Sequence, residues 1–156
     1  MIIDKNNYKD FLRYGGKVLD CNNRGITEIK YLPQGLEYLF CYNNKLTYLP
    51  ELPESLIVLY CYYNKLTYLP ELPRALEGLH CYHNKLTRLP ALPKSLIRLD
   101  CEYNELTYLP ELPESLKHID CRFNPNLPYA GVYISKEKIK ELRKRINMDL
   151  YLLGKL

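Results

Sequence analysis

The chain has 156 residues, of which 26% are charged, and this length favours a single domain. No stretch approaches the ~18 consecutive apolar residues of a membrane span, and the charged start MIIDKNNYKDF lacks the apolar run of a secretory signal. The net charge of +4 falls entirely within residues 135–156, so we predict a neutral body and a basic tail.

Residues 1–15 precede a repeated pattern and are predicted to form an N-terminal cap. We expect a short helix that is capped by Asn6 or Asn7 and runs through Arg13, with Gly15 and Gly16 ending it. Such a cap is needed because the first repeat of a stacked array would otherwise expose an apolar face.

Residues 16–134 contain six copies of a twenty-residue unit, L-x-x-L-x-C-x-x-N-x-L-T-x-L-P-x-L-P. The cysteines mark its register: Cys21, Cys41, Cys61, Cys81, Cys101 and Cys121. An asparagine follows three residues later in five copies: Asn44, Asn64, Asn84, Asn104 and Asn124. A period this regular predicts a solenoid, in which stacked repeats bury a continuous core.

Each conserved position of the unit has a physical role. In an extended strand alternate side chains face opposite sides, so Leu59 and Cys61 point inward while Val58, Tyr60 and Tyr62 point outward. The asparagine amide is expected to pair with buried backbone groups where the chain turns, and to form a ladder through the stack. The prolines of L-P-x-L-P exclude a regular helix and predict an extended, polyproline-like return.

Residues 135–156 are predicted to form a C-terminal capping helix, which completes one domain overall. Ile139, Leu142, Ile146 and Leu150 make an apolar stripe, and Ser135 is a suitable N-cap. The basic residues of this segment are Lys136, Lys138, Lys140, Arg143, Lys144 and Arg145. They leave open the alternative of a helix that binds nucleic acid or a membrane surface.

From about residue 16 to 128, the unit resembles the leucine-rich repeat signature L-x-x-L-x-L/C-x-x-N-x-L. Its short L-P-x-L-P return resembles the subclass found in secreted effectors of enteric bacteria, and similar cysteine-bearing repeats of giant viruses of amoebae. The resemblance implies an α/β-type solenoid: a right-handed superhelix with a parallel β-sheet on its concave face, an extended convex side and a helical cap at each end. Some such effectors carry a ubiquitin-ligase domain with a catalytic cysteine after the repeats. That activity is not carried over, because this chain has no cysteine after Cys121.

The six cysteines occupy inward positions and are predicted to be reduced, buried thiols that pack as small apolar groups. Cysteines on adjacent parallel strands match disulfide geometry poorly. A zinc-binding ladder is the alternative, but no C-x-x-C pair occurs. We therefore expect no metal and a reducing, cytoplasmic compartment, with the cytosol of a host cell as a further alternative.

The outward positions of the strands form the candidate binding surface. Its predicted partner-binding residues are Tyr38, Phe40, Tyr42, Val58, Tyr60, Tyr62, His80, Tyr82, Arg98, Asp100, Glu102, His118, Asp120 and Arg122. The aromatic block suits a protein interface, since rigid amphipathic rings bind at low entropic cost. Alternatively, the rings only stack across strands and stabilise the sheet. A further column, Asn43, Tyr63, His83, Tyr103 and Phe123, extends the surface along one edge.

The sequence predicts a non-catalytic protein-binding module. Its three histidines are separated from any nucleophile, and no phosphate-binding loop or hydrolase motif occurs, so we expect neither catalytic residues nor a cofactor. The expected partner is an unidentified protein, with nucleic acid disfavoured and the chain a monomer or weak homodimer. The alternatives are nucleic-acid or membrane-surface binding by the basic helix, and homodimerisation through the aromatic face.

Overall fold

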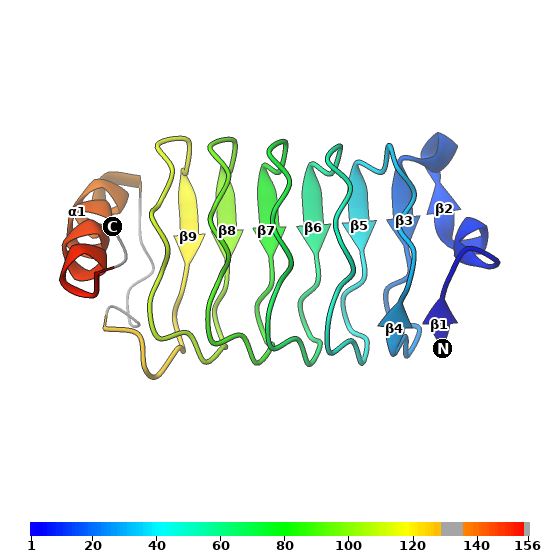
Figure 1. Cartoon of the computed structure of the whole chain (residues 1–156), viewed down its shortest axis with the longest axis horizontal. Coiled ribbons are helices and arrows are strands. Elements are labelled where there is room, and N and C mark those ends of the chain that lie inside the picture. Colours follow the sequence, from blue (N-terminus) through cyan, green and yellow to red (C-terminus); the bar gives the residue numbers. More distant parts are fainter. Residues whose placement is uncertain (129–135, 155–156) are drawn as a thin grey trace.

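A computed structural model describes residues 1–128 and 136–154 of the protein, with side chains described up to 128 and from 138 to 154. The strands stand side by side in one row, with the N-terminus at one end and a helix at the other (Figure 1). The repeat strands are β3 (Val18–Asp20), β5 (Tyr38–Phe40), β6 (Val58–Tyr60), β7 (Gly78–His80), β8 (Arg98–Asp100) and β9 (His118–Asp120). This arrangement confirms the predicted parallel-sheet solenoid.

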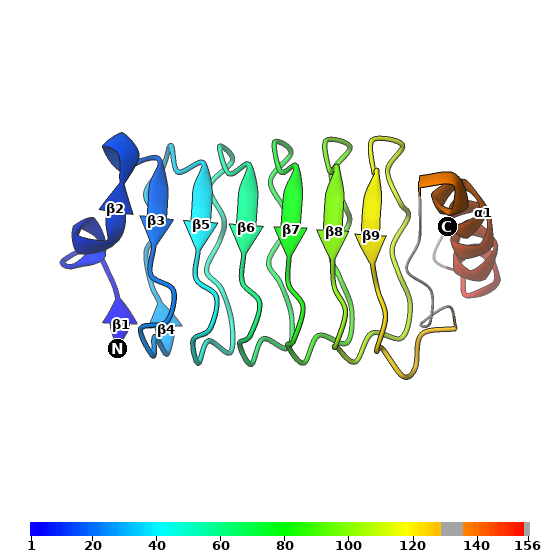
Figure 2. The same ribbon diagram turned by 180° about the vertical axis from the view of Figure 1, so that it is seen from behind.

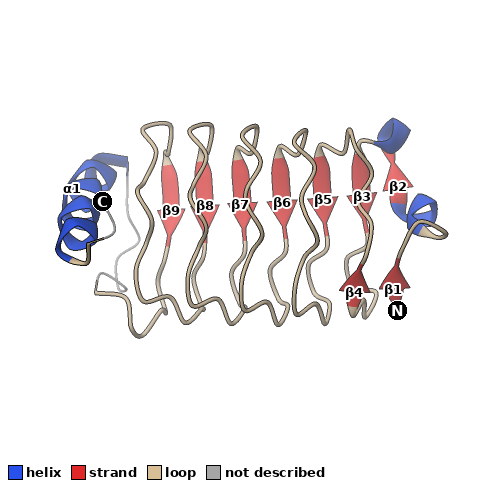
Figure 3. Ribbon diagram, in the orientation of Figure 1, coloured by secondary structure: helices blue, strands red, loops and turns tan. Residues whose placement is uncertain are grey.

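The strands pair in parallel with a constant register of twenty residues. Leu39 pairs with Leu59, and Leu59 with Leu79, so the same repeat position recurs along each row of the sheet. The connections between β3 and β9 contain no helix (Figure 3), as the prolines predict. Seen from behind, these returns run alongside the strands (Figure 2).

The core is one continuous cluster formed by the inward leucines and cysteines. Leu59 and Leu79 are fully buried, and so are Cys61 and Cys81. Burial of each such leucine contributes about 1.5–3 kcal/mol. Because one turn contacts only its neighbours, this stabilisation accumulates through stacking.

The asparagines form the predicted ladder. Asn84 is representative: its Nδ2 donates to the carbonyls of Cys61 and Cys81, at 3.1 and 3.0 Å, while its Oδ1 accepts from the Leu66 N–H at 3.0 Å. One side chain therefore satisfies backbone groups on two successive repeats. This explains why the residue recurs every turn.

The predicted N-terminal helix is confirmed only in part: a 3₁₀ helix, η1 (Tyr8–Phe11), begins after Asn7 at its N-cap but ends at Phe11 instead of Arg13. The strand β2 (Leu12–Arg13) and a second 3₁₀ turn, η2 (Tyr14–Gly16), follow it. β2 pairs antiparallel with β3, and β1 (Ile2–Ile3) pairs in parallel with β4 (Glu28–Ile29). Covering the open sheet edge with strands satisfies its unpaired backbone groups, which a helix would leave exposed.

The helix α1 (Lys136–Leu152) lies against the other end of the array. Its stripe of Ile139, Leu142, Ile146 and Leu150 is buried in the core cluster. Ser135, the predicted N-cap, lies outside the described residues, and the division into 1–15, 16–134 and 135–156 stays a prediction. Within the described residues, no helix has the length and apolar content that crossing a bilayer requires.

Candidate protein-binding surface

The concave face, meaning the solvent side of the repeat strands, carries two columns of aromatic rings. In the inner column, Phe40 meets Tyr60 edge to face at 5.2 Å, and Tyr60 stacks on His80 at 4.3 Å. In the outer column, Tyr62 stacks between Tyr42 at 4.5 Å and Tyr82 at 4.3 Å. The twenty-residue register creates both columns, because residues at one repeat position become neighbours on adjacent strands.

These rings are less exposed than the sequence suggests. All six are half-buried, since each ring covers the face of the next. Burial raises the pKa of the Tyr82 hydroxyl well above its usual value, and the neighbouring Tyr62 raises it further. The stacks therefore hold the rings rigidly and leave their edges toward solvent.

Gly78 of β7 lies beside Val58 of the neighbouring strand β6. A Cβ at Gly78 would lie only 3.3 Å from a methyl group of Val58, so a side chain at this position would crowd Val58. Tyr38 completes the aromatic block, with its ring 6.4 Å from that of Phe40.

The other end of the concave face carries charges that pair internally. Asp100 accepts from His80 Nδ1 at 2.7 Å and from Arg98 Nε at 2.9 Å. Burial alone would raise the pKa of Asp100, but the bonds from His80 and Arg98 outweigh it and lower that pKa. Asp120 pairs with Arg122, whose Nη2 lies 2.7 Å away. The contact of His80 with Asp100 is not among the contacts predicted from the sequence, although the two residues are partners on adjacent strands.

Glu102, at the same end of the face, has a carboxylate that its neighbours compensate only in part. Its Oε2 is buried and has no hydrogen-bond partner among the described residues. Burial raises its pKa to about 6, and Asp120 and Asp100 add to that rise. The carboxylate lines a hollow of about 80 Å³ together with Arg98 and His118.

The predicted edge column is the most exposed aromatic feature of the repeats. Its rings stack in succession: Tyr63 on His83 at 4.4 Å, His83 on Tyr103 at 4.1 Å and Tyr103 on Phe123 at 4.2 Å. Each has a positive φ between 50 and 55°, a conformation that bulky residues adopt rarely. These rings line a shallow, open depression of about 560 Å³ together with Lys85 and Glu105.

The cysteines lie on the opposite side of the sheet from these surfaces. All six are free and buried, and burial raises the pKa of each thiol, to about 12 for Cys21 and Cys121. Among the described residues, no group of histidine, cysteine or carboxylate side chains is arranged to hold a metal ion. Reactive thiolate is therefore disfavoured at each cysteine.

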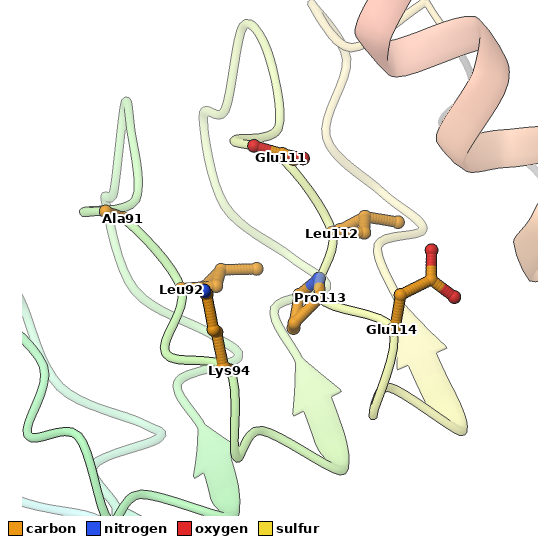
Figure 4. A pocket seen from close by; sticks show the side chains of 7 residues that line it. All are labelled: Ala91, Leu92, Lys94, Glu111, Leu112, Pro113 and Glu114. Carbon is orange, nitrogen blue, oxygen red and sulfur yellow. The ribbon is translucent and has the colours of Figure 1, made fainter.

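A hollow of about 460 Å³ lies on the convex side near α1. Its lining residues are Ala91, Leu92, Lys94, Glu111, Leu112, Pro113 and Glu114, which spread along two neighbouring returns without converging on a common point (Figure 4). At the array's end, Arg143 of α1 donates to the carbonyls of Pro113 at 2.6 Å and Leu112 at 3.3 Å. These bonds engage part of the basic helix in capping.

The parallel register, the buried leucines and the asparagine ladder together define a leucine-rich repeat solenoid. The chain is similar to the leucine-rich repeat domain of a Shigella effector, with 40% identity over 75% of this chain and 54% of that chain, and a TM-score of 0.71. It is also similar to YopM, a leucine-rich effector of Yersinia pestis, with 37% identity over 80% and 38% of the two chains and a TM-score of 0.69. For YopM of Yersinia enterocolitica WA-314 the identity is 37%, over 71% and 27%, with a TM-score of 0.64.

The chain thus spans about half the length of the Shigella domain and less of each YopM chain. No family model matches it, and no curated protein does either. Its structural neighbours are bacterial effector proteins built from repeats of this kind.

Proposed function

We propose that the chain is a non-catalytic protein-binding module, and that its concave aromatic face holds the partner. The observation that supports this is the pair of stacked columns, centred on Tyr60 and Tyr62. Leucine-rich repeat solenoids present extended concave surfaces to their partners. Rings that are already fixed in place lose little further freedom when a partner binds.

The stacking also supports the alternative that the rings only stabilise the sheet. The two roles differ in what they require of the charged end of the face. Sheet stability gains nothing from the under-compensated carboxylate of Glu102, whose burial is unfavourable. A partner with a basic side chain at this position would relieve that cost and fix its own orientation along the face.

The compartment follows from the thiols. Six buried free cysteines in leucine positions suit a reducing environment. We propose the cytoplasm, and the similarity to bacterial effectors makes the cytosol of a host cell the alternative.

The experiment compares two variants with the same loss of three tyrosines. Tyr60, Tyr62 and Tyr82 are changed to Ala on the concave face, and Tyr48, Tyr68 and Tyr108 are changed to Ala on the convex side as the matched control. Each protein captures partners from a eukaryotic cytosolic lysate, and binding of the retained protein is then measured with purified components. Circular dichroism checks that each solenoid is folded.

Loss of binding in the concave variant, with binding kept by the convex control, is the expected result. If a partner binds the concave variant as tightly as the native chain, the rings are sheet stabilisers and the proposal fails. If the concave variant unfolds, Glu102→Arg provides a milder test, because it reverses the charge and leaves the stacks in place.

A further inference from the structure

The C-terminal half of α1 is apolar on both of its sides. One side carries the buried stripe that packs on the end of the array. On the opposite side Met148 is 59% exposed, Tyr151 70% and Leu152 73%, and Leu153, just beyond the helix, is 58% exposed. These four residues are called the apolar tip below. A helix that is apolar all round is normally covered on every side, so the tip is expected to meet a partner.

The leucines of the tip differ from the other leucines of the described chain. Leu152 and Leu153 are the only two there that are exposed, because every other one is buried or half-buried. Single apolar residues scattered over a surface are normal. A contiguous exposed cluster of four is instead typical of an interaction site.

The same face of the helix is basic before it becomes apolar. Lys140, Lys144 and Met148 follow one another at intervals of four residues, which places them in one row along α1. Both lysines are exposed, and neither forms an ion pair with any residue in the described part of the chain. Between residues 138 and 154, five basic side chains stand against two acidic ones, Glu141 and Asp149. The row therefore joins a cationic segment to an apolar end.

This combination favours an anionic lipid surface over a protein or a nucleic acid. A stable protein interface takes about 20–30 residues from each partner, whereas the tip supplies four. A nucleic acid would attract the lysines but would leave the leucines in water. A bilayer satisfies both groups, because acyl chains accept leucines without a complementary shape and anionic headgroups attract the lysines.

The spacing along the helix also fits the depth of such a contact. An α-helix rises about 1.5 Å per residue, so Lys144 lies about 12 Å behind Leu152 along the axis. Interfacial helices bury their apolar side chains about 5–10 Å below the headgroups. With the tip at that depth, Lys144 stays at the level of the lipid phosphates, which its long side chain can reach.

We infer that α1 docks the protein on an anionic lipid surface, with the apolar tip in the interface and Lys140 and Lys144 against the headgroups. The contact uses no residue of the concave face. The inference therefore goes beyond the proposed function and does not depend on it. A molecule docked in this way still presents its concave face to a protein partner.

Cosedimentation of the full chain with lipid vesicles tests the inference. Vesicles of phosphatidylcholine with about a third phosphatidylserine should bind the native chain, and vesicles of phosphatidylcholine alone should bind it about tenfold more weakly. Lys140→Glu/Lys144→Glu should weaken binding to the anionic vesicles about tenfold or more. Lys45→Glu/Lys65→Glu makes the same change of net charge at exposed positions of the solenoid. It is the matched control and should bind within about twofold of the native chain.

The apolar contribution is tested with a second pair of variants. Tyr151→Ser/Leu152→Ser changes two exposed positions, so it should fold and should weaken binding about tenfold or more. Tyr14→Ser/Tyr68→Ser removes two exposed rings elsewhere and should leave binding unchanged. Circular dichroism checks that all variants are folded.

A fluorescent label separates insertion of the tip from electrostatic adhesion. All six native cysteines are free and buried, so Leu153→Cys supplies a single reactive thiol for an environment-sensitive fluorophore. Its emission should shift to the blue on anionic vesicles. The emission of the same label in Tyr14→Cys should not shift, because that residue lies outside the contact.

Four results would overturn the inference. They are absence of binding to the anionic vesicles, unchanged emission of the label at residue 153, undiminished binding of Tyr151→Ser/Leu152→Ser, and an equal loss of binding in Lys45→Glu/Lys65→Glu. A native mass of twice 18.5 kDa in sedimentation equilibrium, returned to the single value by Tyr151→Ser/Leu152→Ser, would overturn it as well. The tip would then join two copies of the chain.

Discussion

Replacing Asn104 by Ala tests the account of the asparagine ladder. Asn104 is only 4% exposed. Its Oδ1 accepts from the Leu86 N–H at 3.0 Å, and its Nδ2 donates to the carbonyls of Cys81 and Cys101, both at 3.1 Å. Water cannot replace these bonds, because the site is buried.

The size of the effect can be worked out bond by bond. The Cys81 carbonyl keeps its bond from Asn84, and the Cys101 carbonyl keeps its bond from Asn124. Each therefore loses one of two donors, at a cost of about 0.5–1 kcal/mol. The Leu86 N–H loses its side-chain acceptor, and an unsatisfied buried donor costs about 1–3 kcal/mol. We expect the free energy of unfolding to fall by about 3 kcal/mol.

The assay is equilibrium unfolding in urea, followed by circular dichroism and by tyrosine fluorescence, since the chain has 16 tyrosines and no tryptophan. Coincident transitions would establish that the repeats unfold together. Lys65→Ala, at an exposed position, is the control and should change the free energy by less than about 0.5 kcal/mol.

A companion variant separates the acceptor from the donors. Asn104→Asp keeps the Oδ1 acceptor for Leu86 but turns an oxygen toward two carbonyls, so it should destabilise at neutral pH at least as much as Asn104→Ala. A loss below about 1 kcal/mol for Asn104→Ala, with coincident transitions, would refute the view that the ladder holds the repeats together.

Three further predictions concern the thiols, the acidic end of the face and the C-terminal helix. Burial raises the pKa of Cys61 and the other thiols, so iodoacetamide at mildly alkaline pH should label the native chain far more slowly than the urea-unfolded chain. Equal labelling rates, measured by mass spectrometry, would contradict the burial of these thiols. The folded-state pKa of Glu102, about 6, lies above the ordinary 4.5, so stability should fall as pH rises through this interval. Glu102→Gln should then match the native chain at about pH 4 and exceed it by about 1 kcal/mol at neutral pH, after discounting for partial exposure; parallel pH profiles of melting temperature would argue against this. Arg143→Ala removes the bonds to Leu112 and Pro113 and should lower the free energy of unfolding by about 2 kcal/mol. Lys144→Ala, at an exposed position, is the control and should change it little. Equal changes for the two variants in urea unfolding would show that Arg143 does not cap the array.

The N-terminal cap shows where local sequence reasoning fails. The pattern around Asn7 and Arg13 resembles a capped helix, yet Leu12 and Arg13 pair with Leu19 and Val18 across an intervening turn. Local propensity is a weak preference that a neighbouring sheet edge can override. Nothing in the sequence of this segment indicates that the edge of the sheet at β3 will lie beside it.

The candidate binding surface also shows which features the sequence predicts and which only the structure reveals. The sequence places Tyr62, His83 and Asp100 on outward positions; in the structure the rings of Tyr62 and His83 are half-buried, and Asp100 is only 8% exposed. The sequence does not reveal that Asp100 binds His80, or that the ring of His83 is held between those of Tyr63 and Tyr103. Both contacts join residues twenty apart, so they exist only after the repeats have stacked in register.

The sequence by itself determined the solenoid. Its period requires each inward leucine, cysteine and asparagine to meet its own equivalent on the next turn, and only stacked parallel strands satisfy that requirement. The tertiary structure decided how far each ring is exposed, which charges are paired and which surfaces remain open. These properties depend on contacts between successive turns and on the left-handed backbone at the edge column, for which the side-chain pattern carries no signal.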